Sequence, residues 1–181
     1  MSVVKQTFSV GDIRYYTEGH YELDGDNCLT YRSGPAVGGF ELFLGDGYLM
    51  FLGVDRGTGE CGPAYSRLPY TTAFKKASLQ ISDAVKAGLY YQSDWLKTQD
   101  GGHYFPFLQE VYCDPDTLIF AFGNVEAKGT LIEFAENTYA MLDHEVLKAI
   151  YLKVSQDVFD GVFKFNKKLK RKIVRHWLLG W

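Results

Sequence analysis

A glycine-rich segment, Gly57-Thr58-Gly59-Glu60-Cys61-Gly62, has the glycine spacing of a phosphate-binding loop. Such a loop binds an anion when it opens directly into a helix, because the free backbone amides of the first turn then hold the phosphate. Here Pro63 follows at once, and the helix that we expect begins only at Thr72. The segment therefore predicts a tight turn between strands, and we expect no cofactor.

Two further patterns concern metal ions. Asp24-Gly25-Asp26-Asn27 offers oxygen ligands, but Cys28-Leu29-Thr30 follows where a calcium loop of the EF-hand type needs more oxygen ligands and a distal Glu. This segment predicts a turn between strands. The histidines do not lie at ligand spacing from one another or from a cysteine, so we expect no metal site. They are His20, His103, His144 and His176.

Nucleophilic catalysis requires a nucleophile beside a base. Cys61, paired with His20 or His103, is the nearest approach that the sequence offers, and nothing in the spacing supports that geometry. The motifs of serine hydrolases, zinc peptidases and nucleotide hydrolases are missing from the sequence. We therefore assign no catalytic residues and favour a protein that is not an enzyme. The alternative is a small enzyme whose site is assembled only in three dimensions.

The charge of the chain is unevenly distributed. A stretch near the C-terminus holds seven basic residues and no acidic one, and removing it from the net charge of −3 leaves about −10 on the rest. On a helix this stretch makes a basic surface. The alternatives are a solvated face, nucleic-acid binding, or contact with an anionic membrane. The residues are Lys164, Lys167, Lys168, Lys170, Arg171, Lys172 and Arg175.

Targeting signals and cysteine usage suggest a compartment. The first residues lack the apolar stretch of a signal peptide, and no run approaches the roughly 18 apolar residues of a membrane span. The three cysteines are far apart and odd in number, which argues against a disulfide framework. We expect a cytoplasmic protein without a membrane span.

The expected elements are strands and two helices. Residues 7–62 and 101–154 have the turn spacing and the aromatic content of two antiparallel β-meanders. Apolar residues recur at helical spacing from Thr72 to Tyr91, and again from Ser155 to Trp181. The sequence thus predicts an α+β fold, in which an amphipathic helix follows each meander.

The order of meander, helix, meander, helix suggests an internal repeat. A shift of 91 residues places Tyr21 on Tyr112 and Met50 on Met141. One interpretation is a single domain, residues 1–181, formed by duplication of halves 1–91 and 92–181 around one shared core. The alternative is that two β-rich halves merely share composition and turn spacing.

The expected function follows from composition and from the lack of catalytic motifs. Aromatic residues make up 16% of the chain, and an acidic, aromatic surface suits the masking of a basic active site. We therefore favour a non-catalytic protein-binding module, such as a cytoplasmic immunity or inhibitor protein. Another protein is the expected partner, and nucleic acid bound through the basic helix is the alternative. The expected partner contacts are Tyr15, Tyr16, Tyr21, Tyr48 and Tyr65.

Overall fold

The computed structural model describes residues 7–24, 28–33, 40–44, 50–67, 75–76, 81, 83–93, 96, 102–105, 110–114, 116–122 and 129–162. Fifteen strands account for most of these residues. They are β1 (Thr7–Gly11), β2 (Gly19–Leu23), β3 (Cys28–Ser33), β4 (Phe40–Leu44), β5 (Met50–Val54), β6 (Cys61–Arg67), β7 (Lys75–Lys76), β8 (Val85–Lys86), β9 (Gly88–Gln92), β10 (Gly102–Phe105), β11 (Glu110–Asp114), β12 (Thr117–Ala121), β13 (Thr130–Ala135), β14 (Thr138–Asp143) and β15 (Val146–Lys153).

The predicted helix from Thr72 to Tyr91 is wrong, because strands β7, β8 and β9 lie there and none of the residues described in this range is helical. The apolar spacing that suggests a helix also contains a strand pattern. Leu89 and Tyr91 are buried while Tyr90 between them is half-exposed. Antiparallel pairing of β9 with β1 satisfies the backbone of this segment and prevails over local helix propensity.

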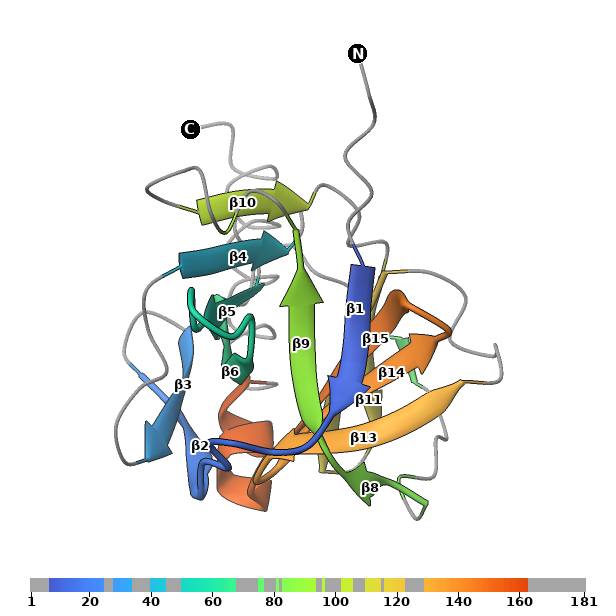
Figure 1. Cartoon of the computed structure of the whole chain (residues 1–181). Helices are drawn as coiled ribbons and strands as arrows, with labels where there is room; N and C mark the ends of the chain where they lie inside the picture. Colours follow the sequence, from blue (N-terminus) through green and yellow to red (C-terminus); the bar gives the residue numbers. More distant parts are fainter. Residues whose placement is uncertain are drawn as a thin grey trace, which may run out of the picture.

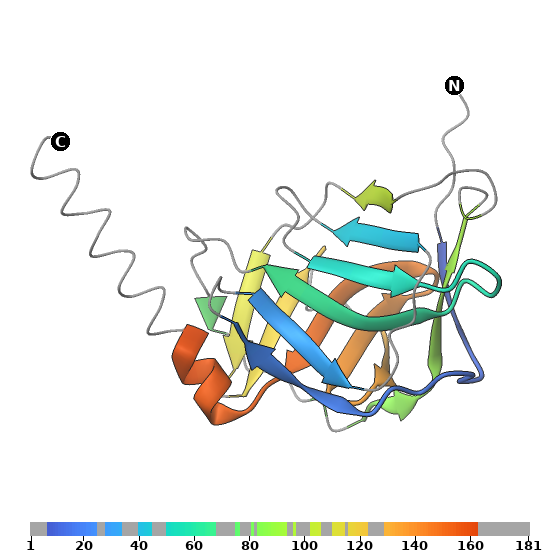
Figure 2. The same ribbon diagram turned by 90° about the vertical axis from the view of Figure 1, so that its left-hand side faces the viewer.

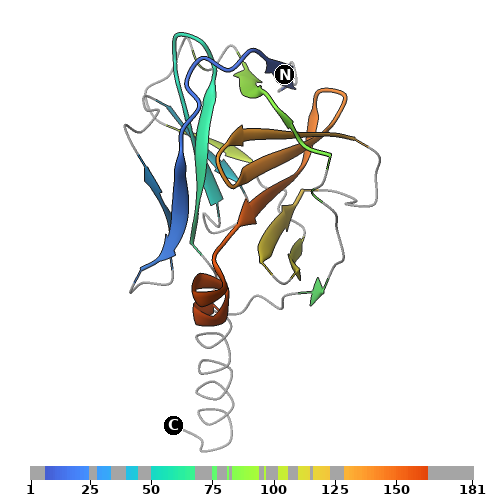
Figure 3. The same ribbon diagram turned by 90° about the horizontal axis from the view of Figure 1, so that it is seen from below.

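The second predicted helix is helical at its start, in residues 156–162. The Ser155 hydroxyl accepts a hydrogen bond from the Val158 amide at 3.4 Å, which makes Ser155 the N-cap. Figure 3 shows this helix near the ends of the two sheets. The rest of the predicted helix lies outside the described residues. An α+β fold is therefore wrong, since among the described residues no other helical segment exceeds a single residue.

The strands form two large sheets, which pack face to face in Figures 1 and 2. One has six strands in the order β10-β4-β5-β6-β3-β2, and the other has seven in the order β7-β11-β12-β15-β14-β13-β8. Leu42 and Leu52 from the first sheet share one apolar cluster with Phe120 and Ile150 from the second, and none of these four side chains is exposed. The architecture is a β-sandwich with its main core between the sheets.

The expected meanders are also corrected, because neither sheet pairs its strands purely in chain order. β3 pairs with β6 and β12 pairs with β15, so each sheet contains a crossover. The strand order β2-β3-β6-β5-β4 nonetheless recurs as β11-β12-β15-β14-β13, with antiparallel pairing throughout. The 91-residue shift matches Tyr21, which is buried, with Tyr112, which is half-buried. The duplication stays a prediction.

A two-stranded ribbon of β1 and β9 stands between the two sheets in Figure 1. Gly11 lies opposite Gly88 in its register, and the Tyr90 ring covers both glycines. A Cβ at Gly88 would meet that ring at 2.8 Å and the Asp12 carbonyl oxygen at 2.9 Å, so position 88 needs glycine. The ribbon fixes where the following segment, residues 12–18, leaves β1.

Candidate functional site

The segment between β1 and β2, residues 12–18, is the best-defined candidate site and is called the β1–β2 loop below. The Tyr90 hydroxyl donates to the Asp12 carbonyl at 2.5 Å. Farther along, the Thr17 carbonyl accepts hydrogen bonds from the Tyr31 hydroxyl at 3.0 Å and from the Glu136 amide at 2.9 Å. The loop is therefore attached to the ribbon and to both sheets.

Glu60 holds the middle of the β1–β2 loop. Its Oε1 atom accepts hydrogen bonds from the backbone amides of Arg14 at 2.9 Å and Tyr15 at 3.2 Å. Glu60 is only 2% exposed, whereas the Tyr15 side chain is 59% exposed. The loop thus exposes the Tyr15 side chain to solvent, while its backbone is hydrogen-bonded to a buried carboxylate.

Thr58 and Asp55 build the turn that places Glu60. The Thr58 hydroxyl donates to Asp55 Oδ1 at 2.8 Å and accepts the Glu60 amide at 3.1 Å. Hydrogen bonds from Thr58 lower the pKa of Asp55, so this carboxylate is ionised at neutral pH. The segment with phosphate-loop spacing is thus a turn, as expected, and it serves to position a buried carboxylate.

Tyr16 lies on the other side of the loop, beneath Lys86. The Lys86 ammonium is 4.4 Å from the centroid of the Tyr16 ring, which is a cation–π contact. Burial raises the pKa of Tyr16, and the neighbouring Lys86 partly offsets this rise. The contact joins the β1–β2 loop to β8, at the edge of the seven-stranded sheet.

Two further tyrosines surround this contact. Burial raises the pKa of Tyr139 to about 12, with the Glu133 carboxylate as the next cause. Burial likewise raises the pKa of Tyr31, and the Glu136 carboxylate adds to this effect. These phenols stay protonated at neutral pH, so they serve here as hydrogen-bond donors and packing groups.

Alkaline pH is expected to destabilise the fold. A folded-state pKa of about 12 at Tyr139 and Tyr151 lies above the ordinary value of 10. The folded state therefore keeps protons that the unfolded chain releases, and stability falls as pH rises from 10 to 12. Denaturant titrations at pH 8, 10 and 11 should show this fall, and Tyr151→Phe should reduce it. If the free energy of unfolding fell equally with pH in the wild type and in Tyr151→Phe, the raised pKa of Tyr151 would be contradicted.

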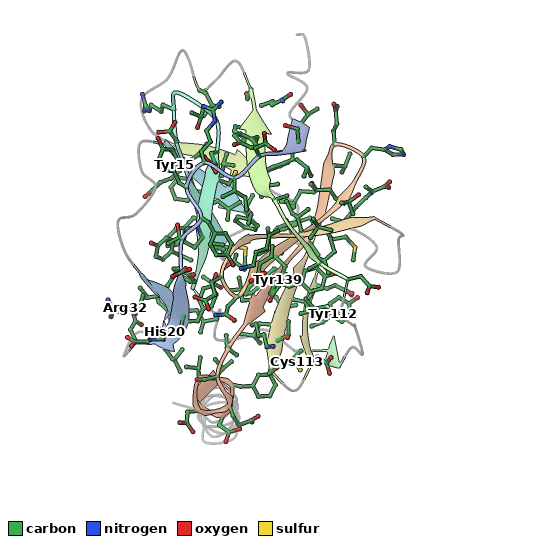
Figure 4. All side chains as sticks on the ribbon, turned by 60° about the horizontal axis from the view of Figure 1, so that its bottom comes forward. Tyr15, His20, Arg32, Tyr112, Cys113 and Tyr139 are labelled. Carbon is green, nitrogen blue, oxygen red and sulfur yellow. The ribbon has the colours of Figure 1, made fainter. Side chains whose placement is uncertain are left out.

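The predicted partner contacts are placed differently from one another. Tyr15 and Tyr16 are neighbours on the β1–β2 loop, and Figure 4 shows Tyr15 well away from Tyr139. Tyr65 lies on β6 and stacks on Phe51 with ring centroids 5.5 Å apart. Tyr21 is 2% exposed, and its hydroxyl lies 2.6 Å from the Thr138 hydroxyl, so it faces the core. Tyr48 lies outside the described residues.

The histidines and Cys61 do not come together as a catalytic set among the residues whose side chains are described. The His20 side chain is 67% exposed, and it lies beside Glu22, which also bonds Arg32 at 2.8 Å (Figure 4). Cys61 is buried, and burial raises the pKa of its thiol well above the ordinary value. Such a thiol is a poor nucleophile at neutral pH. The His103 side chain and His176 lie outside the described part of the chain.

Glu60 and Lys86 were not identified from the sequence. Glu60 lies within the glycine-rich segment, where only the phosphate spacing drew attention, and its contacts with Arg14 and Tyr15 are tertiary. Lys86 lies in the segment that the sequence predicts to be helical. The seven basic residues of the C-terminal stretch lie outside the described residues, so the predicted basic surface stays a prediction.

The structure describes Asp24 and Cys28 at the two ends of the segment with calcium-loop resemblance, but not residues 25–27 between them. Asp24 Oδ1 accepts a hydrogen bond from the Cys28 amide at 2.9 Å, as in a turn between β2 and β3. Over the described ranges, no three His, Cys, Asp or Glu residues lie close enough to hold a metal ion. No helix in those ranges is long and apolar enough to cross a membrane.

Comparison with known proteins adds no family: no family model matches the chain, and the search of curated proteins gave no match.

Proposed function

We propose that the chain is a non-catalytic binding module that takes a protein partner on the β1–β2 loop, with Tyr15 as the central contact. One observation carries this proposal. The Tyr15 side chain is 59% exposed, while the Tyr15 backbone amide is hydrogen-bonded to Glu60. An aromatic side chain on a preformed backbone offers a large contact area at low entropic cost.

Charge supports a basic partner. Outside the basic C-terminal stretch, the chain carries about −10. Asp12 and Glu18 are exposed on the β1–β2 loop, together with one base, Arg14. Such a surface would attract a basic protein and hold it through Tyr15. A cytoplasmic immunity or inhibitor protein, which covers the basic active site of its target, is the form of this function that we favour.

Tyr15→Ala is expected to weaken partner binding by about 30-fold or more, which corresponds to the roughly 2 kcal/mol of a hot-spot residue. Because Tyr15 is exposed, its loss should change the free energy of unfolding by no more than about 0.5 kcal/mol. The partner would be captured from native lysate at low and high salt and identified by mass spectrometry. Its affinity would then be measured by calorimetry with the purified proteins.

Val146→Ala is the matched control, because Val146 is 55% exposed but lies on β15 rather than on the loop. It should leave affinity unchanged within about twofold. Capture of one stoichiometric partner at high salt, lost only with Tyr15→Ala, would support the proposal. Equal binding by the two variants would reject Tyr15 as the contact. Recovery only of proteins that dissociate in high salt would reject the binding-module function.

A further inference from the structure

Glu60 is a buried carboxylate that contacts the β1–β2 loop. It is 2% exposed, and its Oε2 atom is enclosed without a hydrogen-bond partner among the described residues. A carboxylate in such a place costs free energy unless its donors compensate. Its donors are two amides of the β1–β2 loop, so the loop is where the benefit of this group lies.

The two amides have a particular position in the loop. The anchors at either end hold carbonyl groups, those of Asp12 and Thr17. Within the described part of the chain, the amides of Arg14 and Tyr15 donate to Glu60 alone. Both amides converge on the same Glu60 oxygen, at 2.9 Å and 3.2 Å. Glu60 therefore controls the backbone at the residue whose side chain is presented.

Glu60 is itself held from two sides. Its amide is bonded to the Thr58 hydroxyl, and its backbone forms an isolated antiparallel bridge with Tyr90. Tyr90 in turn donates to the Asp12 carbonyl. The turn before β6, strand β9 and the β1–β2 loop thus form one connected network.

We infer that Glu60 is a positioning residue, which sets the backbone of the β1–β2 loop around Tyr15 before any partner arrives. Its purpose rests on the proposed function, but the positioning itself is a property of the free protein. A preset loop keeps the ordering cost out of the binding step. The conformation of residues 14 and 15 then depends on one carboxylate supplied by a distant part of the chain.

Amide hydrogen exchange in the free protein, read by NMR, tests the inference. In Glu60→Ala, the Arg14 and Tyr15 amides should exchange at least tenfold faster, relative to the core amides of Leu52 and Ile150. Glu60→Gln keeps one acceptor oxygen of the same shape, so its increase should be smaller. If the alanine variant does not fold, the isosteric glutamine variant alone still gives the test.

Asp24→Asn is the control, because Asp24 also accepts a backbone amide, that of Cys28 at 2.9 Å, but lies after β2 rather than on the β1–β2 loop. It should leave exchange at Arg14 and Tyr15 unchanged relative to the core. The inference would be overturned if, in the Glu60 variants, exchange at Arg14 and Tyr15 rose only as much as exchange at the core amides.

Binding of the purified partner separates the two proposals. Provided that its thermal stability is unchanged, the Glu60→Gln variant should bind the partner at least fivefold more weakly than the wild type. Tyr15→Ala should weaken binding further. Faster loop exchange with no effect of Tyr15→Ala on binding would reject the proposed function and leave the positioning intact. If Tyr15→Ala weakens binding but the Arg14 and Tyr15 amides of the Glu60 variants exchange at the wild-type rate, the positioning role of Glu60 is rejected.

Discussion

Gly59→Ala should destabilise the protein by about 3 kcal/mol or more, the upper range for a strained residue. Gly59 has a φ of +80°, which L-residues rarely adopt, and a Cβ there would meet the Tyr91 carbonyl oxygen at 2.5 Å. That oxygen belongs to backbone and cannot rotate away. For a chain of this length, scanning calorimetry should record a fall in Tm of roughly 6–12 °C.

Gly57→Ala is the matched control in the same turn. A Cβ at Gly57 would have one close neighbour, Asp55 Oδ1 at 3.5 Å, which is an ordinary contact distance. The change should therefore cost no more than about 0.5 kcal/mol. Similar losses of stability in Gly59→Ala and Gly57→Ala would mean that the turn tolerates a side chain equally at both positions. The positive φ of Gly59 would then be contradicted.

Core truncations in the two sheets should lower one common unfolding transition. Leu52 on β5 and Ile150 on β15 are fully buried in the same apolar cluster. Leu52→Ala and Ile150→Ala should each cost about 2–5 kcal/mol, from lost burial and from the cavity left behind. Calorimetry and circular dichroism should both show a single, shifted transition in each variant.

Val146→Ala serves again as the control, because its side chain is largely exposed and its truncation opens no cavity. Two separate transitions, one moved by Leu52→Ala and the other by Ile150→Ala, would instead show two independently folding units. The predicted single domain with a shared core would then be wrong.

The local features of the fold are those that the sequence could predict. The glycines from Gly57 to Gly62 and the Pro63 after them predict a tight turn between strands, and the structure has this turn between β5 and β6. Ser155 predicts the start of a helix, and the structure caps the helix of residues 156–162 there. In each case neighbouring residues hold the whole signal.

The failures have a tertiary origin. Nothing local to residues 88–92 shows that β1, some eighty residues earlier, supplies their backbone partners. The crossovers from β3 to β6 and from β12 to β15 are likewise decided by packing of the two sheets. The spacing of apolar residues along the chain, taken alone, therefore predicts a helix in this segment.

The candidate site was predictable in part. Tyrosine content drew attention to Tyr15 and Tyr16, but sequence does not distinguish an exposed tyrosine from Tyr21, whose ring lies in the core. Glu60 could not be found as an anchor, because it bonds residues 45 and 46 positions away. Only the three-dimensional pairing of β9 with the turn before β6 brings them together.

The ribbon of β1 and β9 has a consequence for the order in which the chain folds. Thr7 pairs with Gln92, so β1 has no ribbon partner until a further 85 or so residues have been synthesised. At about 5–20 residues per second, this wait lasts roughly 4–17 seconds. During that time the polar edge of β1 is open to other chains. A chaperone that covers β1 during this time should therefore raise the yield of folded protein.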